Sequence, residues 1–268
     1  MNEIDNDKKI YNCAKKFLLN KTPNEVTNEV IESYLNYSEN PTSKNWTMKD
    51  IFLRFLVSAQ NANMKAGVIG GSIGGVENLK SVLFDFNPKK VYERFQDSEK
   101  LLNEIVDKLK PNGAIRRTEK SIWPKYCKTI ISVSEFLSQF SDEEDFFKWA
   151  NYFYNDSRSM PALPMILSEE VYGIGFPLAC DFLKELGYIN YGKPDVHIKD
   201  IFEAHNLIQK NATNYQILKV IIRIANNVGV TAYNVDKLFW LIGSGKFYNH
   251  PYIPVKRLKE EFISQKCS

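Results

Sequence analysis

The chain has 268 residues, of which 44% are hydrophobic and 25% are charged, as in an ordinary globular protein with a sizeable core. The net charge of +3 is compatible with nucleic-acid binding but does not argue for it. No apolar run approaches the roughly 20 residues that a membrane-spanning helix needs, and the first ten residues contain no apolar signal core. These features predict a soluble, cytoplasmic protein without a membrane segment.

The four cysteines are far apart and form no C-x-x-C pair. This spacing excludes a zinc ribbon and a clustered iron–sulfur site. Together with the missing signal core, it also argues against an oxidised, secreted protein. The cysteines are Cys13, Cys127, Cys180 and Cys267.

Apolar residues with helical spacing begin near the N-terminus, where the segments 9–19 and 24–34 each predict a helix. A polar linker is expected at 37–45, and a strongly apolar helix at 50–66. The glycine-rich segment 67–75 is expected to form a loop or a tightly packed helix pair, because glycine destabilises a helix interior. A phosphate-binding loop is the less favoured alternative, since the order G-x-x-x-x-G-K-[ST] is absent.

Helical patterns continue through the rest of the chain, without a convincing strand or an internal repeat. The fold class predicted from the sequence is therefore all-α. The further helices are expected at 78–86, 88–95, 98–108, 125–139, 142–154, 165–172, 176–186, from 195 onward, at 215–227 and at 232–242.

Two of these predicted helices are joined by Gly173-Ile174-Gly175, a G-x-G hairpin. Glycines allow a tight backbone turn and keep side chains off its outer surface. The exposed N–H groups, together with the start of the next helix, can hold a phosphate group of nucleic acid. The alternative is a turn with a purely structural role.

A loop and a new helix follow the hairpin, and this helix opens with Asp195 in the sequence P-D-V-H-I. This order of a hairpin, a helix, a loop and an aspartate in a D-x-H context resembles that of the helix-hairpin-helix DNA glycosylase superfamily, HhH-GPD. Upstream, the sequence F-L-V-S-A-Q at 55–60 is similar to the L-L-S-A-Q helix end of the endonuclease III group, in which the glutamine enters the DNA stack. Gln60 is the matching residue, and the resemblance spans residues 50–205.

The resemblance implies two helical lobes with a DNA-binding cleft. Residues 1–48 would pack with the C-terminal lobe, and residues 191–268 would complete that lobe. Residues 49–190 would form the central lobe, with the helix-hairpin-helix motif at 163–187. The implied contacts to duplex DNA come from Gln60, Gly173, Gly175, Phe176 and Lys193.

Asp195 is the residue on which catalysis would depend. Cleavage of an N-glycosidic bond builds positive charge on the deoxyribose, and a nearby carboxylate stabilises this charge and orients or deprotonates a water molecule. The structural alternative is that Asp195 caps its helix, and one residue can do both. His197 is expected to be structural, because no cluster of metal ligands surrounds it.

The hairpin departs from the bifunctional members of the superfamily, which carry a nucleophilic lysine in the order G-x-G-x-K. Pro177 occupies that position here, and proline suits an early position of a helix. The resemblance therefore implies a monofunctional enzyme that uses water and has no β-lyase activity. The four-cysteine cluster of the endonuclease III group is also missing. Lys193 could in principle supply an amine, but solvent exposure or a phosphate contact is the favoured interpretation.

A base pocket and a cation site complete the predicted site. A flipped base is held between aromatic or apolar surfaces, and each candidate ring has a place in the core as its alternative. The candidate rings are Trp46, Trp123 and Tyr126. By match with the superfamily, a sodium or potassium ion that bridges to phosphate would be bound by the backbone carbonyls of Glu169, Val171 and Ile174. No other cofactor is expected.

The leading hypothesis is a monofunctional DNA glycosylase that removes a damaged or modified base flipped from duplex DNA. Alkylated purines, oxidised bases and hypermodified bases of viral DNA stay open as substrates, although the missing lysine disfavours oxidised bases. The alternatives are a non-catalytic helix-hairpin-helix DNA-binding protein and a helical protein whose glycine turn is only structural. We expect a monomer that acts on the nucleoid, in base excision repair or in defence against viral DNA, and not at a membrane.

Overall fold

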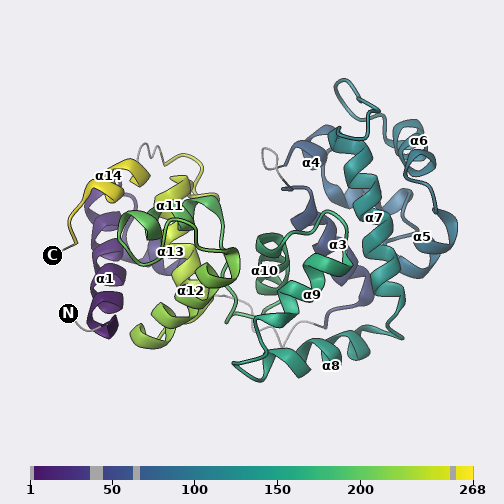
Figure 1. Ribbon diagram of the computed structural model, residues 1–268. Helices are drawn as coiled ribbons and strands as arrows, with labels where there is room; N and C mark the ends of the chain where they lie inside the picture. The colour runs from purple at the N-terminus through teal and green to yellow at the C-terminus, as the bar shows by residue number, and fades with distance from the viewer. Residues whose placement is uncertain (1–2, 37–44, 63–66, 254–257, 268) are drawn as a thin grey trace. The chain divides into compact units, whose positions relative to one another are not determined.

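The structure is a computed structural model, and it describes residues 3–36, 45–62, 67–253 and 258–267 (Figure 1). The regular elements in these ranges are fourteen α-helices and one 3₁₀ helix, with no strand among them. The predicted all-α class is therefore confirmed. None of the described helices is both long and apolar enough to cross a membrane.

The helices are separated by turns and loops of different lengths. In chain order they are α1 (Glu3–Lys21), α2 (Asn28–Leu35), α3 (Met48–Ala59), α4 (Val68–Ile73), η1 (Val76–Ser81), α5 (Pro88–Arg94), α6 (Ser98–Leu109), α7 (Ile122–Ser138), α8 (Glu143–Tyr154), α9 (Ala162–Glu170), α10 (Phe176–Glu185), α11 (Val196–Ala204), α12 (Asn214–Val228), α13 (Ala232–Ser244) and α14 (Leu258–Ser264).

Several elements differ from the prediction. The glycine-rich segment contains the short helix α4, because the left-handed conformations at both of its ends fall on glycines, Gly67 and Gly74. The helix expected at 78–86 is the 3₁₀ helix η1 followed by turns, and α14 was not predicted at all. Helix α3 ends at Ala59, so Gln60 is its C-cap and does not lie inside a longer helix.

The chain divides into two compact units. Unit 1 contains Met1–Ser43 and Gly187–Ser268, and unit 2 contains Lys44–Leu186. Unit 1 therefore joins the two ends of the chain. The sequence analysis predicted divisions at 48/49 and at 190/191, and these stay a prediction.

Unit 1 is built around α13, which contacts α1, α2, α11, α12 and α14. Figure 1 labels α13 together with α1, α11, α12 and α14. Its core consists of aliphatic and aromatic side chains from all of these helices. A buried polar cluster adds to the contact between α1 and α12. The fully buried carboxylate of Asp7 accepts hydrogen bonds from Arg223 Nε at 2.9 Å and from Asn227 Nδ2 at 2.7 Å.

A disulfide bond links Cys13 of α1 to Cys267, which follows α14. The two residues are 254 positions apart in the chain, but α1 and α14 are in contact within unit 1. The sequence argued against an oxidised, secreted protein partly from the wide spacing of the cysteines, and this bond shows that wide spacing does not exclude a disulfide. Separation along the chain was a poor guide here, because the fold brings the first and last helices together.

Unit 2 is centred on α7, which packs against α3, α5 and α6. Helix α10 packs against both α3 and α9. Aromatic rings fill the contact between α3 and α10, where Phe55 and Phe182 are stacked with their ring centroids 3.5 Å apart. The hairpin between α9 and α10 therefore lies on a well-packed helical support.

Candidate functional site

The glycine hairpin connects α9 to α10, and its turn rests on α7. The amide of Ile174 donates a hydrogen bond to the carbonyl of Val171 at 3.1 Å, which closes the turn. The amide of Tyr172 donates to Ser132 Oγ at 2.9 Å. Gly173 has a φ of +82°, and a Cβ atom on it would lie 2.2 Å from Thr129 Oγ1. Only glycine fits this position without strain.

The outer side of the hairpin carries little side-chain bulk. Gly173 and Gly175 are both exposed, and a Cβ atom on Gly175 would meet nothing closer than Pro177 Cδ at 3.9 Å. Gly175 is the N-cap of α10, and no side chain caps this helix. Pro177 lies in the first turn, where the N–H that it lacks would have no partner within the helix. Phe176 is half-buried beside them.

Gln60 lies in the same unit as the hairpin, at the end of α3. Its Oε1 atom accepts a hydrogen bond from the amide of Gly70 in α4 at 3.2 Å. A Cβ atom on Gly70 would lie only 2.9 Å from the same oxygen, so the glutamine packs closely on α4. In this conformation Gln60 connects α3 to the glycine-rich segment.

A polar contact joins α3 to α10 next to the stacked phenylalanines. Ser58 Oγ donates to Asp181 Oδ2 at 3.0 Å, and the Arg54 guanidinium lies 3.9 Å from the same carboxylate oxygen. Arg54 also donates to Ser58 Oγ at 3.0 Å. The helix that ends at Gln60 is thereby fixed to the helix that starts at the hairpin.

Asp195 lies in unit 1 and is the N-cap of α11. Its Oδ1 atom accepts the amides of His197 at 2.9 Å and of Ile198 at 3.1 Å. Its Oδ2 atom has no hydrogen bond to any residue that the structure describes. Asp195 as a whole residue is partly exposed.

The segment that leads to Asp195 is held against α13. The amide of Lys193 donates to Asp236 Oδ2 at 2.9 Å, and Asp236 is 1% exposed. A Cβ atom on Gly192 would lie 2.7 Å from Ile221 Cγ2 of α12 and 3.2 Å from Asp236 Cβ. The chain can follow this path only because residue 192 has no side chain.

His197 provides a second contact to α13, on the other side of Asp195. A Cβ atom on Gly243 would lie 2.4 Å from His197 Cβ and 3.3 Å from its Nδ1 atom. The Nδ1 atom is buried and has no hydrogen bond within the described part of the chain. The histidine therefore packs on the glycine, and its structural role stays a prediction.

Burial raises the pKa of Asp195 above its usual value, and the negative charge of Asp236 raises it further. The hydrogen bond from the Ile198 amide and the nearby groups His197 and Lys193 act in the opposite direction. The pKa of this carboxyl group therefore reports on both its burial and its charged neighbours. Raised pKa values of this kind are common at functional sites.

The three aromatic residues predicted for the base pocket lie in unit 2. Trp123 is 6% exposed and Tyr126 is 2% exposed, and the Tyr126 hydroxyl donates to the carbonyl of Leu56 at 3.0 Å. Both rings belong to the core around α7, which favours the structural alternative for each of them. Trp46 is half-buried just before α3.

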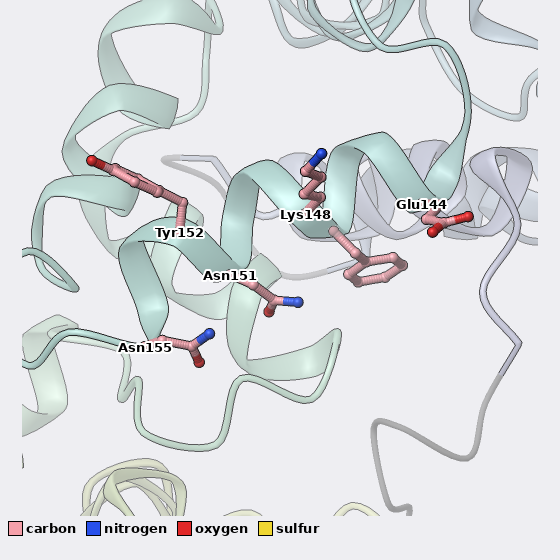
Figure 2. A pocket seen from close by; sticks show the side chains of 6 residues that line it. Glu144, Lys148, Asn151, Tyr152 and Asn155 are labelled. Carbon is pink, nitrogen blue, oxygen red and sulfur yellow. The ribbon is translucent and has the colours of Figure 1, made fainter.

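A surface hollow of about 640 Å³ runs along α8 in unit 2. Figure 2 shows Asn151 and Asn155 on one side of this helix, whereas Lys148 and Tyr152 point to another. The hollow is open, and α8 carries none of the predicted site residues. We therefore do not connect it with the hairpin or with Asp195.

Sequence reasoning missed the residues that position the two candidate sites. Ser132 and Thr129 support the hairpin from a helix about 40 residues earlier in the chain. Asp236 and Gly243 contact the Asp195 segment from a helix about 40 residues later. No local pattern marks these residues, because each works through a tertiary contact.

Comparisons with known proteins place this geometry in context. No protein-family model matches the sequence, and no curated protein matches it. Solved structures do match. The 8-oxoguanine DNA glycosylase of Methanocaldococcus jannaschii is 17% identical with a TM-score of 0.56, and the match covers 88% of this chain and 94% of that chain.

Two further structures have similar scores. The 8-oxoguanine glycosylase/lyase of M. jannaschii in complex with a 15mer DNA containing 8-oxoguanine is 19% identical with a TM-score of 0.53, and the match covers 85% of this chain and 98% of that one. The 8-oxoguanine DNA glycosylase of Thermotoga maritima is 14% identical with a TM-score of 0.53, over 88% of this chain and 98% of that one. The chain therefore has the fold of these DNA glycosylases.

Proposed function

We propose that this protein is a monofunctional DNA glycosylase, in which Asp195 promotes hydrolysis of the N-glycosidic bond of a damaged or modified base in duplex DNA. The observation that carries the proposal is the geometry of the Asp195 carboxylate. One of its oxygens is held by two backbone amides, and the other has no partner among the described residues. A fixed carboxylate with one available oxygen is suited to stabilise an oxocarbenium-like sugar and to orient a water molecule.

The hairpin supports the DNA-binding part of the proposal. Its exposed glycines leave the backbone accessible, and the start of α10 is not capped by a side chain. Such a surface can accept a phosphate group without reading the base sequence. Gln60 belongs to the same unit, and Lys193 is a further candidate for a DNA contact.

The hairpin also has the chemistry expected of an alkali-cation site. Glu169 and Val171 lie at the C-terminal end of α9, where the last carbonyls of a helix have no partner within it, and the Val171 carbonyl also accepts the Ile174 amide of the turn. Carbonyl oxygens are the ligands that such hard cations prefer. We propose that these two carbonyls and that of Ile174 would hold a sodium or potassium ion, which would attract a DNA phosphate.

Pro177 supports hydrolysis in preference to lyase chemistry. The superfamily's bifunctional members have a lysine amine at this position, and proline has no nucleophilic side chain. The base that is removed stays open. The matched structures are named for 8-oxoguanine, so this base belongs in any substrate panel beside alkylated purines and hypermodified bases.

The proposal is tested by incubating the full chain with duplexes that contain each of these bases and by detecting released bases with mass spectrometry. We expect one class of base to be released, leaving abasic sites that break only after heat or alkali. Asp195→Asn should lower the rate of release by at least about a hundredfold. The duplex affinity of this variant should stay within roughly twofold of wild type.

Asp200→Asn is the matched control, because Asp200 lies on the same helix and forms an ion pair with Lys259 away from the loop. It should release bases at the wild-type rate. A wild-type protein that binds duplex DNA but releases no base from the panel would favour the non-catalytic binding protein. Absence of salt-sensitive duplex binding would favour a purely structural hairpin.

A further inference from the structure

Asp236 of α13 is a buried carboxylate to which the proposed reaction assigns no role. Burial of a charged group is unfavourable unless hydrogen bonds compensate for the lost water. One of the hydrogen bonds that the carboxylate accepts comes from the backbone amide of Lys193, at 2.9 Å from Asp236 Oδ2. This amide belongs to the residue two positions before Asp195, so the cost of burying Asp236 is linked to the path of that segment.

The packing around residues 192–195 also fixes this segment against α13. Gly192 lies against Asp236 and Ile221, with space for a hydrogen atom but not for a methyl group. On the other side of Asp195, His197 lies against Gly243 of the same helix. Asp195 is thus bracketed by two close contacts with α13, and Asp236 supplies the hydrogen bond at the first of them.

The charges near Asp195 come from three places. Asp236 faces it from α13, Lys193 from the preceding loop and His197 from its own helix. Helix α14, which also packs on α11, directs its Lys259 to Asp200 further along that helix. Within the described residues, Asp236 is the acidic group that acts on the charge of Asp195.

We propose that Asp236 is a positioning residue for Asp195: it anchors residues 192–195 on α13 and places a second negative charge beside the reactive carboxylate. The inference rests on the proposed function, because only that function makes the Asp195 carboxylate a reactive group. The geometric part does not depend on it, because the anchor and the charge act on Asp195 whether or not a base is released.

Two variants separate the anchor from the charge. Asp236→Asn keeps an oxygen that can accept the Lys193 amide but removes the negative charge. Asp236→Ala removes both. If the alanine variant fails to fold, the asparagine variant still tests the electrostatic part, and circular dichroism of each variant shows whether the helices are intact.

The first readout does not require activity. In the ¹⁵N-labelled full chain, the amide signals of His197 and Ile198 should follow the ionisation of Asp195, because both amides donate to its Oδ1 atom. In Asp236→Asn we expect the midpoint of this titration to move to lower pH, since a repulsive charge has been removed. Asp195→Asn should abolish the transition and so identify it.

The second readout is the single-turnover rate of base release as a function of pH. The acid limb of Asp236→Asn should move to lower pH, with a plateau within about threefold of wild type. Asp236→Ala should lose at least roughly tenfold at every pH, because small displacements of a catalytic group are costly. A merely structural role for Asp236 would lower the rate without moving the acid limb.

The outcomes distinguish failure of the inference from failure of the proposed function. An unmoved amide titration in Asp236→Asn, with an active wild-type protein, overturns the inference alone. A shifted titration in a protein that releases no base overturns the proposed function and leaves the positioning role standing. Full activity of Asp236→Ala at every pH would overturn the anchoring role.

Discussion

The hairpin in unit 2 and the Asp195 segment in unit 1 are both loops that lead into a helix. The two helices differ in how the amides of their first turn are capped. At α10 the N-cap is Gly175, and no side chain reaches the open amides. At α11 the N-cap is Asp195, whose carboxylate binds the amides of His197 and Ile198. The first amides of α10 are left for an external hydrogen-bond acceptor, whereas those of α11 already bind a carboxylate.

The residue at the N-cap can therefore make the same kind of loop-to-helix connection suited to binding or to chemistry. An uncapped helix start with exposed glycines favours an external anion such as phosphate. A helix start that carries its own carboxylate disfavours an anion by charge, but it holds that carboxylate in one orientation. The proposed DNA contact of the hairpin and the proposed chemistry of Asp195 can therefore be tested separately.

The largest expected effect comes from placing a nucleophile in the hairpin. Pro177→Lys introduces the amine that bifunctional helix-hairpin-helix glycosylases carry at the matching position. If the proposed function holds, this variant should gain strand cleavage and should be trapped on DNA by borohydride, whereas wild type gives no trapped species. Pro177→Ala is the control. Trapping of wild-type protein would show that an amine elsewhere in the chain already acts as the nucleophile.

A smaller effect is expected from the backbone of the hairpin. Gly173→Ala forces a Cβ atom against Thr129 at a φ of +82°, so we expect a loss of about 2–4 kcal/mol in the free energy of unfolding. A methyl group on Gly175 would meet only Pro177 Cδ, at an ordinary contact distance of 3.9 Å, so Gly175→Ala should cost less than about 1 kcal/mol. Urea unfolding followed by circular dichroism gives both values.

Gly175→Ala also tests the role assigned to the hairpin, because its methyl group would occupy the surface that a phosphate approaches. We expect weaker duplex binding with near-normal stability, measured by fluorescence anisotropy at several salt concentrations. Unchanged affinity in this variant would remove the hairpin from the DNA interface and leave Gly173 with a structural role only.

The smallest effect concerns stability at Asp195. Because its pKa is raised in the folded protein, the folded state holds this proton more tightly than the unfolded chain does. Ionisation therefore lowers the free energy of unfolding as the pH rises through the raised pKa. Asp195→Asn keeps a capping oxygen and should be at least as stable as wild type at neutral pH, with the difference disappearing in acid.

Asp195→Ala separates the cap from the charge. It should be about 1 kcal/mol less stable than Asp195→Asn, since alanine cannot accept the amides of α11. Equal stability of the two variants would show that the capping bonds contribute nothing measurable. A neutral-pH destabilisation by Asp195→Asn would contradict the sign expected from the pKa.

The sequence alone determined the features that are local in the chain. Helical periodicity placed most of the helices and the all-α class, because a repeat of 3.6 residues is read over a single segment. The glycine pair of the hairpin and Asp195 at the start of α11 were also predicted from adjacent residues. Pro177 could be compared with the expected lysine by position alone.

Only the tertiary structure decided which residues support these features. The contacts of Thr129 with Gly173, of Asp236 with Lys193 and of His197 with Gly243 each join residues about 40 positions apart or more. The disulfide between Cys13 and Cys267 spans almost the whole chain. Such pairs leave no periodic or local signal, because their proximity is created by the packing of helices and not by the order of residues.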